Sequence, residues 1–107
     1  MKIHNLSEML NGWFVGPFHP CVINTDVCEV AVKNYKKGHI EKSHFHKIAT
    51  EVTVVISGTI KMNGIVYAEG SIILMEPGEK TDFEALSDST NVVFKMPGAL
   101  TNDKFFV

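Results

Sequence analysis

The sequence predicts an all-β fold of antiparallel strands, and three features carry that prediction. Residues 51–57 are rich in β-branched side chains, which favour pleated sheet over helix. Asn63-Gly64 separates two short alternating runs, the strongest local hairpin signal, because both central residues of a type I′ turn need a positive φ. Similar short runs recur between Gly and Pro turns along most of the chain. The pattern indicates a meander of antiparallel strands rather than βαβ units.

Length and composition set the broad class of protein. The chain has 107 residues, the size of a single domain spanning residues 1–107. Charged residues make up 21% of it and the formal net charge is −2, so no basic field suggests a nucleic acid or an anionic membrane as partner. No apolar run approaches the ~20 residues that span a bilayer, and no signal peptide opens the chain. We therefore expect a soluble, cytoplasmic protein.

One short helix is expected near the N-terminus, before the strands begin. Asn5 can cap the first amides of a two-turn helix, and Glu8 stands three residues later, as in a capping box. Asn11-Gly12 can end the helix in a left-handed turn. Extended structure should then begin at Trp13.

The segment from Val27 to Tyr35 reads as a long strand, but its orientation is open. Lys33 and Tyr35 share one face of it. Facing inward, a cation and a phenol beside a metal could orient an anionic or carbonyl substrate. Facing outward, they are part of a solvated surface. A one-residue change of register exchanges the two faces, so the sequence alone does not decide.

Two imidazoles and a carboxylate lie close together in the next segment. His44 and His46 are two residues apart, so on a strand both side chains point to the same face. Glu51 follows a polar interval that allows the chain to turn back, which brings a carboxylate to face the histidines. Two imidazole nitrogens and one carboxylate oxygen suit a divalent first-row metal with open coordination positions.

The spacing of this segment resembles the first sequence motif of the cupin superfamily. Gly38, His44, His46, Glu51 and Gly58 occupy its fixed positions: Gly, five residues, His-x-His, four residues, Glu, six residues, Gly. The resemblance implies a cupin-type antiparallel β-barrel, also described as a double-stranded β-helix or jelly roll. It also implies that the two histidines and the glutamate point into the barrel and hold a divalent transition metal: iron, manganese, nickel or zinc.

The second cupin motif is present only in part. Gly70, a short strand and Pro77-Gly78 match it, but the histidine expected after them is missing. Thr81 or Asp82 occupies its place, and Asp82 is the chemically suitable substitute, so we predict Asp82 as a ligand or a partner of one. The structural alternative is that Asp82 faces outward or caps the turn while Phe83 packs inside.

The resemblance extends the prediction to a substrate pocket. Thr53 shares a face with Glu51 along the second motif strand, and Phe83 lies beside the missing ligand position. Together with Lys33 and Tyr35, these two residues are our candidates for lining the pocket. The opposite face of residues 51–57 is wholly apolar, which predicts a cover from a second sheet or a partner subunit, and hence a homodimer.

Two classes of function remain open, since one fold hosts many reactions. The first is a metal-dependent enzyme of dioxygenase, isomerase or lyase type acting on a small polar molecule. Three ligands with open positions resemble non-haem iron oxygenases, a fourth ligand at Asp82 fits isomerase or lyase chemistry, and Glu51 could instead act as a general base. The second is a non-catalytic barrel module that binds a sugar or small acid, because small cupins resemble proteins of carbohydrate metabolism. A third possibility is a barrel whose histidines bind nothing.

Overall fold

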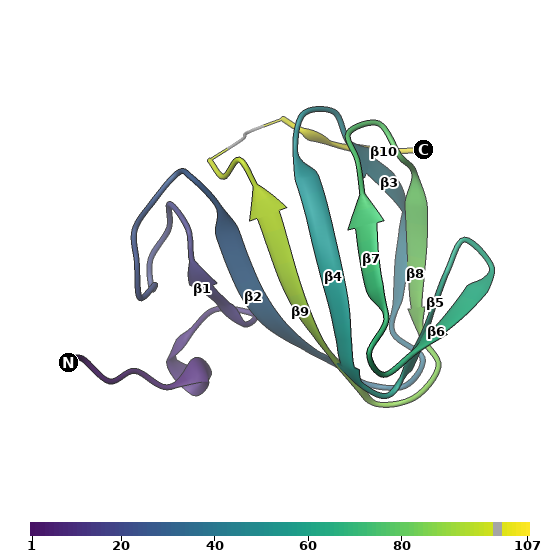
Figure 1. The fold of residues 1–107 in the computed structure, drawn as a ribbon, viewed down its shortest axis with the longest axis horizontal. Helices are drawn as coiled ribbons and strands as arrows, with labels where there is room; N and C mark the ends of the chain where they lie inside the picture. The colour runs from purple at the N-terminus through teal and green to yellow at the C-terminus, as the bar shows by residue number, and fades with distance from the viewer. Residues whose placement is uncertain (100–101) are drawn as a thin grey trace.

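The computed structural model describes residues 1–99 and 102–107, which form a barrel of two facing antiparallel sheets (Figure 1). One sheet has the spatial order β1-β2-β9-β4-β7 and the other β10-β3-β8-β5-β6. In chain order the strands are β1 (Trp13–Val15), β2 (Glu29–Tyr35), β3 (Ile40–His46), β4 (Thr50–Ser57), β5 (Thr59–Met62), β6 (Ile65–Ala68), β7 (Ile72–Met75), β8 (Thr81–Ala85), β9 (Ser89–Met96) and β10 (Lys104–Phe106). The predicted all-β antiparallel fold is confirmed.

The N-terminal helix is shorter than predicted. A single 3₁₀ turn, η1 (Leu6–Glu8), is capped by Asn5, whose side-chain oxygen accepts a hydrogen bond from the Ser7 amide at 2.9 Å. The backbone is extended again at Met9, and none of the three residues of η1 is buried. Without an apolar face to bury, so short a helix gains no tertiary stabilisation and does not extend to two turns. Within the described residues, no helix has the length and apolar character needed to cross a membrane.

The predicted Asn-Gly hairpin joins β5 to β6. Asn63 and Gly64 have φ angles of 50° and 78°, as a two-residue hairpin turn with both centres left-handed requires. The strands pair in register from Thr59 with Ala68 to Met62 with Ile65.

The apolar core fills only part of the barrel. It comprises Val55 of β4, Ile60 and Met62 of β5, and Phe83 and Ala85 of β8. Along the inner face of β4, the side chains change from Glu51 through the buried Thr53 to the buried Val55. The half of the barrel next to the β3–β4 loop is therefore polar, and the half beyond Val55 is packed.

The structure decides the orientation of β2. Ala31 is fully buried, and Lys33 and Tyr35 lie on the same face, which points into the barrel. Lys33 pairs with Asn91 and Tyr35 with Ser89 across the β2–β9 ladder. Strand β9 begins at Ser89, so both pairs lie within the ladder.

The outer face of the first sheet carries exposed apolar side chains. Ile56 of β4 and Ile72 and Leu74 of β7 are 47%, 71% and 53% exposed in the single chain. The homodimer that would cover them stays a prediction.

Gly58 of the first motif is required by its surroundings. Its φ is +83°, and a Cβ at this position would lie 2.4 Å from the Asp88 carbonyl oxygen and 2.6 Å from the Ser89 Cβ. A side chain would therefore meet both a left-handed backbone and a clash. At Gly64, whose φ is +78°, a Cβ would have no atom within 4 Å.

We predict that Gly58→Ala destabilises the fold clearly more than Gly64→Ala. Both variants bear the left-handed penalty of about 1–2 kcal/mol, and only Gly58→Ala adds a backbone clash. Each further 1 kcal/mol should lower the melting temperature by roughly 4–8 °C in a domain of this size. Calorimetry of the two variants measures the difference. Equal melting temperatures would contradict this prediction, because they would show that the surroundings of Gly58 accommodate a methyl group at no cost in free energy.

Candidate metal centre

The histidines and the glutamate of the first motif meet where β3 ends and β4 begins. Only Lys47, Ile48 and Ala49 separate the two strands, so Glu51 lies directly beside the end of β3. Nε2 of His46 is 3.1 Å from Oε2 of Glu51. The predicted turn between the histidines and the carboxylate is therefore present.

His44 lies on the same face as His46, as its spacing predicted. The ring centroids of the two histidines are 5.7 Å apart and their planes are nearly perpendicular, at 85°. Nδ1 of His44 lies 3.1 Å from the Lys42 carbonyl oxygen. If the neutral ring donates its Nδ1 proton to this carbonyl, Nε2 keeps a lone pair available for a ligand.

The charge state of Glu51 follows from its neighbours. Burial by itself would raise the pKa of Glu51, but the hydrogen bond from His46 and the positive potential of His46, His44 and Lys95 outweigh it, so the pKa is lowered. Glu51 is consequently an anion at neutral pH and is able to bind a cation.

The donor set fits a divalent metal by its chemistry, although the geometry of a metal site is not complete. Nε2 of His46 and Oε2 of Glu51 are already adjacent, and Nδ1 of His46 is buried with no hydrogen-bond partner in the part of the chain that the structure describes. Across residues 1–99 and 102–107, no three His, Cys, Asp or Glu side chains are arranged to hold a metal ion as they stand. His44 is the donor that remains apart from the other two.

The structure corrects the prediction for Asp82. Its side chain is exposed, and Oδ1 accepts a hydrogen bond from the Asn63 amide at 2.7 Å, while Asn63 Oδ1 accepts one from the Asp82 amide at 3.2 Å. Asp82 therefore secures the β5–β6 turn, and it does not join the histidines. The reason is the alternation of β8, which turns its neighbours Thr81 and Phe83 inward and leaves Asp82 outside.

Thr81 occupies the inner position opposite His44. The two residues pair across β3 and β8, and Thr81 is buried. Its hydroxyl donates a hydrogen bond to the Asp82 carbonyl at 2.7 Å. A neutral hydroxyl thus stands where the family places a histidine.

The predicted pocket residues surround two adjoining cavities. A cavity of about 240 Å³ is bordered by Lys33 and Tyr35 together with His44, His46 and Glu51. A smaller one of about 50 Å³ lies deeper in the barrel, and its walls include Thr53, Phe83, Thr81, Tyr35, His44, Glu51 and Asn91. Burial raises the pKa of Tyr35, and the negative charges of Glu41 and Glu51 raise it further, so its phenol stays neutral and can donate a hydrogen bond.

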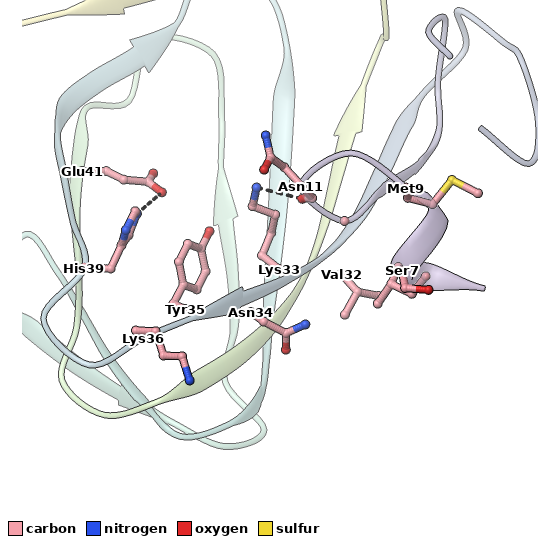
Figure 2. Close-up of a pocket in the computed structure, with 12 residues that line it drawn as sticks. Ser7, Met9, Asn11, Val32, Lys33, Asn34, Tyr35, Lys36, His39 and Glu41 are labelled. Carbon is pink, nitrogen blue, oxygen red and sulfur yellow. Dashed lines mark hydrogen bonds and ion pairs between the residues drawn. The ribbon is translucent and has the colours of Figure 1, made fainter. Parts of the chain in front are cut away.

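A wider hollow of about 850 Å³ leads to these cavities from outside (Figure 2). Lys33, Tyr35 and Glu41 border both this hollow and the 240 Å³ cavity, so the two adjoin. Figure 2 shows Lys33 reaching toward the backbone of Asn11, to whose carbonyl its ammonium donates a hydrogen bond at 3.0 Å. His39 bonds Glu41 at 3.1 Å on the far wall.

Solved structures with the same arrangement of strands identify the fold. A protein from Klebsiella pneumoniae with a double-stranded β-helix domain matches with a TM-score of 0.71 and 22% identity, over 99% of this chain and 91% of that one. An RmlC-like cupin from Shewanella frigidimarina matches with a TM-score of 0.64 and 16% identity, over 70% of each chain. The chain has the cupin fold. Oxalate decarboxylase from Bacillus subtilis, described with Mn(II) centres, matches with a TM-score of 0.63 and 19% identity, over 78% of this chain but 25% of its own.

No protein-family model and no curated protein matches this chain in sequence.

Asp103 is a residue of the site that the sequence reasoning missed. It is only 5% exposed, and its two carboxylate oxygens accept hydrogen bonds from the amides of Ile48 at 2.7 Å and Ala49 at 3.1 Å. Oδ2 also lies 3.7 Å from Nδ1 of His46, which is longer than a hydrogen bond. No local pattern signals this role, because the contacts join residues more than 50 positions apart.

Asn91 is a second residue that the sequence reasoning missed. It is fully buried, and among residues 1–99 and 102–107 neither atom of its side-chain amide has a hydrogen-bond partner. It borders the 50 Å³ cavity, so a polar group within that cavity can form hydrogen bonds with it. The alternation of Asn91, Val93 and Lys95 along one face was the available signal.

We predict that Asp103→Asn lowers the free energy of unfolding on the order of 2 kcal/mol. Asparagine replaces one of the two carboxylate oxygens by an NH₂ group, which cannot accept the backbone hydrogen bond made to that oxygen. The hydrogen bond that is lost is one to a buried charged group, and such bonds are among the stronger ones. Asp88→Asn is the matched control, because exposed Asp88 also accepts one backbone hydrogen bond, from Lys37 at 2.9 Å. It should change the free energy by no more than about 0.5 kcal/mol. Urea unfolding of both variants measures this, and equal losses would contradict the anchoring role.

Proposed function

We propose that this cupin is a metal-dependent enzyme that binds a divalent transition metal through His44, His46 and Glu51. The observation that carries the proposal is the 3.1 Å approach of Nε2 of His46 to Oε2 of Glu51, two donor atoms that face one cavity. His44 borders the same cavity and can bring the second nitrogen. The donor set of two imidazoles and one carboxylate suits iron, manganese, nickel or zinc.

The remaining groups around the cavity suit chemistry on a small polar molecule. When bound, such a metal would act as a Lewis acid on an oxygen of the substrate. The neutral phenol of Tyr35 can donate a hydrogen bond to that substrate, and the ammonium of Lys33 can compensate negative charge. Glu51, anionic and partly buried, is the residue that can hold a proton if it is not fully engaged as a ligand.

The fold supports the proposal only in general terms. Proteins of known structure with this architecture include an enzyme described with Mn(II) centres, which favours a metal here without deciding which one. With Asp82 on the outside and Thr81 within, three protein ligands rather than four are available, which leaves more positions open to a substrate.

A second candidate function is a non-catalytic module that binds a sugar or small acid. Asn91 favours it, because a buried amide with both atoms unsatisfied calls for a polar ligand or water in the deep cavity. The wide hollow of about 850 Å³ in front of the barrel provides the access that either function needs. A binding module would keep its ligand after the metal is removed. A metal-dependent enzyme would lose its activity when the metal is removed.

We predict about one equivalent of transition metal per chain in protein purified without chelators. His46→Ala and Glu51→Gln should each remove most of it, because each deletes one of the donors. His39→Ala is the matched control, since His39 is exposed and pairs with Glu41 outside the donor set. Elemental analysis of the four proteins gives the metal content.

Two results would contradict this assignment. One is an unchanged metal content in His46→Ala. The other is the absence of metal even after anaerobic reconstitution with iron, manganese, nickel or zinc, which would leave the binding module as the supported function. Asp82→Asn should keep its metal, because Asp82 binds the hairpin turn instead.

A further inference from the structure

Three lysines border the cavity that holds the candidate metal ligands. Lys33 comes from β2, Lys95 from β9 and Lys104 from β10, so three separate strands direct cations to one cavity of about 240 Å³. Strand β10 places Lys104 directly opposite His46. The chain as a whole is slightly acidic, with a formal net charge of −2, so this gathering of cations is local.

The two carboxylates that border the cavity, Glu41 and Glu51, contact histidines rather than lysines. Glu51 bonds His46 at 3.1 Å, and Glu41 bonds His39 at 3.1 Å. Lys95 forms an ion pair with Glu29, also at 3.1 Å. In the described part of the chain, neither Lys33 nor Lys104 forms an ion pair. Two cations therefore border the cavity without a carboxylate of their own.

The ammonium of Lys33 is positioned by one hydrogen bond and one aromatic ring. It donates one hydrogen bond, to the Asn11 carbonyl at 3.0 Å, and lies 5.8 Å from the centre of the Trp13 ring. An ammonium has three donors, so two remain for a ligand. Burial lowers the pKa of Lys33, with the nearby charge of Lys104 acting in the same direction and Glu41 against both. An anion in the cavity would offset part of the free-energy cost of burying the charged ammonium group.

Lys104 is held differently, on the opposite wall. Its ammonium lies 5.4 Å from the centre of the Phe106 ring, which itself packs 6.2 Å from the ring of His44. An aromatic face positions a cation without neutralising it. The ammonium of Lys104 is thus placed by the Phe106 ring, on the strand that pairs with the histidine strand.

We propose that Lys33 and Lys104 form an anion subsite, and that the substrate of the metal centre is a small molecule carrying a carboxylate or phosphate group. This inference rests on the proposed function, because it names the substrate class of the same site. The anionic group would lie between the two ammonium groups, with the reacting part of the molecule toward His44, His46 and Glu51. Glu41 on the cavity wall disfavours a second anionic group near His39.

The test measures the binding of simple anions by isothermal titration calorimetry. Malonate and inorganic phosphate are titrated into metal-free and zinc-loaded protein, and malonamide serves as the uncharged analogue. The variants are Lys33→Met, Lys104→Met and the double variant. Lys37→Met is the matched control, because Lys37 lies in the exposed turn after β2, away from the cavity.

We expect one of the two anions to bind, and each cavity variant to weaken that binding by about tenfold, the loss of one charge-assisted hydrogen bond. Lys37→Met should bind as the wild type does, and malonamide should not bind. Tighter binding of malonate would identify a carboxylate substrate, and tighter binding of phosphate a phosphorylated one.

The inference is overturned if neither anion binds in either form, or if the double variant binds as tightly as the wild type. If Lys37→Met lowered the anion affinity as much as Lys33→Met does, the inference would also be overturned, because the attraction would then be nonspecific. Zinc content is measured on the same samples. If the protein takes up neither zinc nor iron, manganese or nickel, the proposed function is refuted, and the titration of the metal-free protein still tests the subsite by itself.

Discussion

The site depends on the anchored loop between β3 and β4. Three residues bring the end of one strand beside the start of the next, and Asp103 holds them by its side chain and by its carbonyl, which accepts the Lys47 amide at 3.1 Å. This places Nε2 of His46 3.1 Å from Glu51. Because Asp103 directly precedes β10, the same contacts seat the last strand beside β3 and bring Lys104 opposite His46. One buried carboxylate therefore connects the metal ligands with the anion subsite.

One end of the barrel interior is an apolar core, and the other end carries the candidate site. The core around Val55, Ile60 and Phe83 is closely packed at one end, whereas imidazoles, carboxylates and ammonium groups line the other. Polar groups cost free energy when they are buried without partners. Asn91 retains such a cost, with both amide atoms unsatisfied where the two regions meet.

The sequence predicted what local spacing determines and missed what depends on distant strands. The two-residue spacing of His44 and His46 suffices to put both on one face, because the strand period is two. The orientation of Lys33 could not be decided, since it depends on the register of β2 against β9. Asp82 was assigned inward on chemical grounds, while the alternation of β8 placed Thr81 there. Asp103 had no local signal, because its partners lie on another strand connection far along the chain.

Anomalous diffraction from crystals grown with manganese or zinc would show whether His44, His46 and Glu51 converge on one metal inside the barrel. We predict a peak within about 2.5 Å of one nitrogen of each histidine and one oxygen of Glu51. A peak held by other residues, such as His39 with Glu41, and none at Glu51, would show that these three side chains are not the metal ligands.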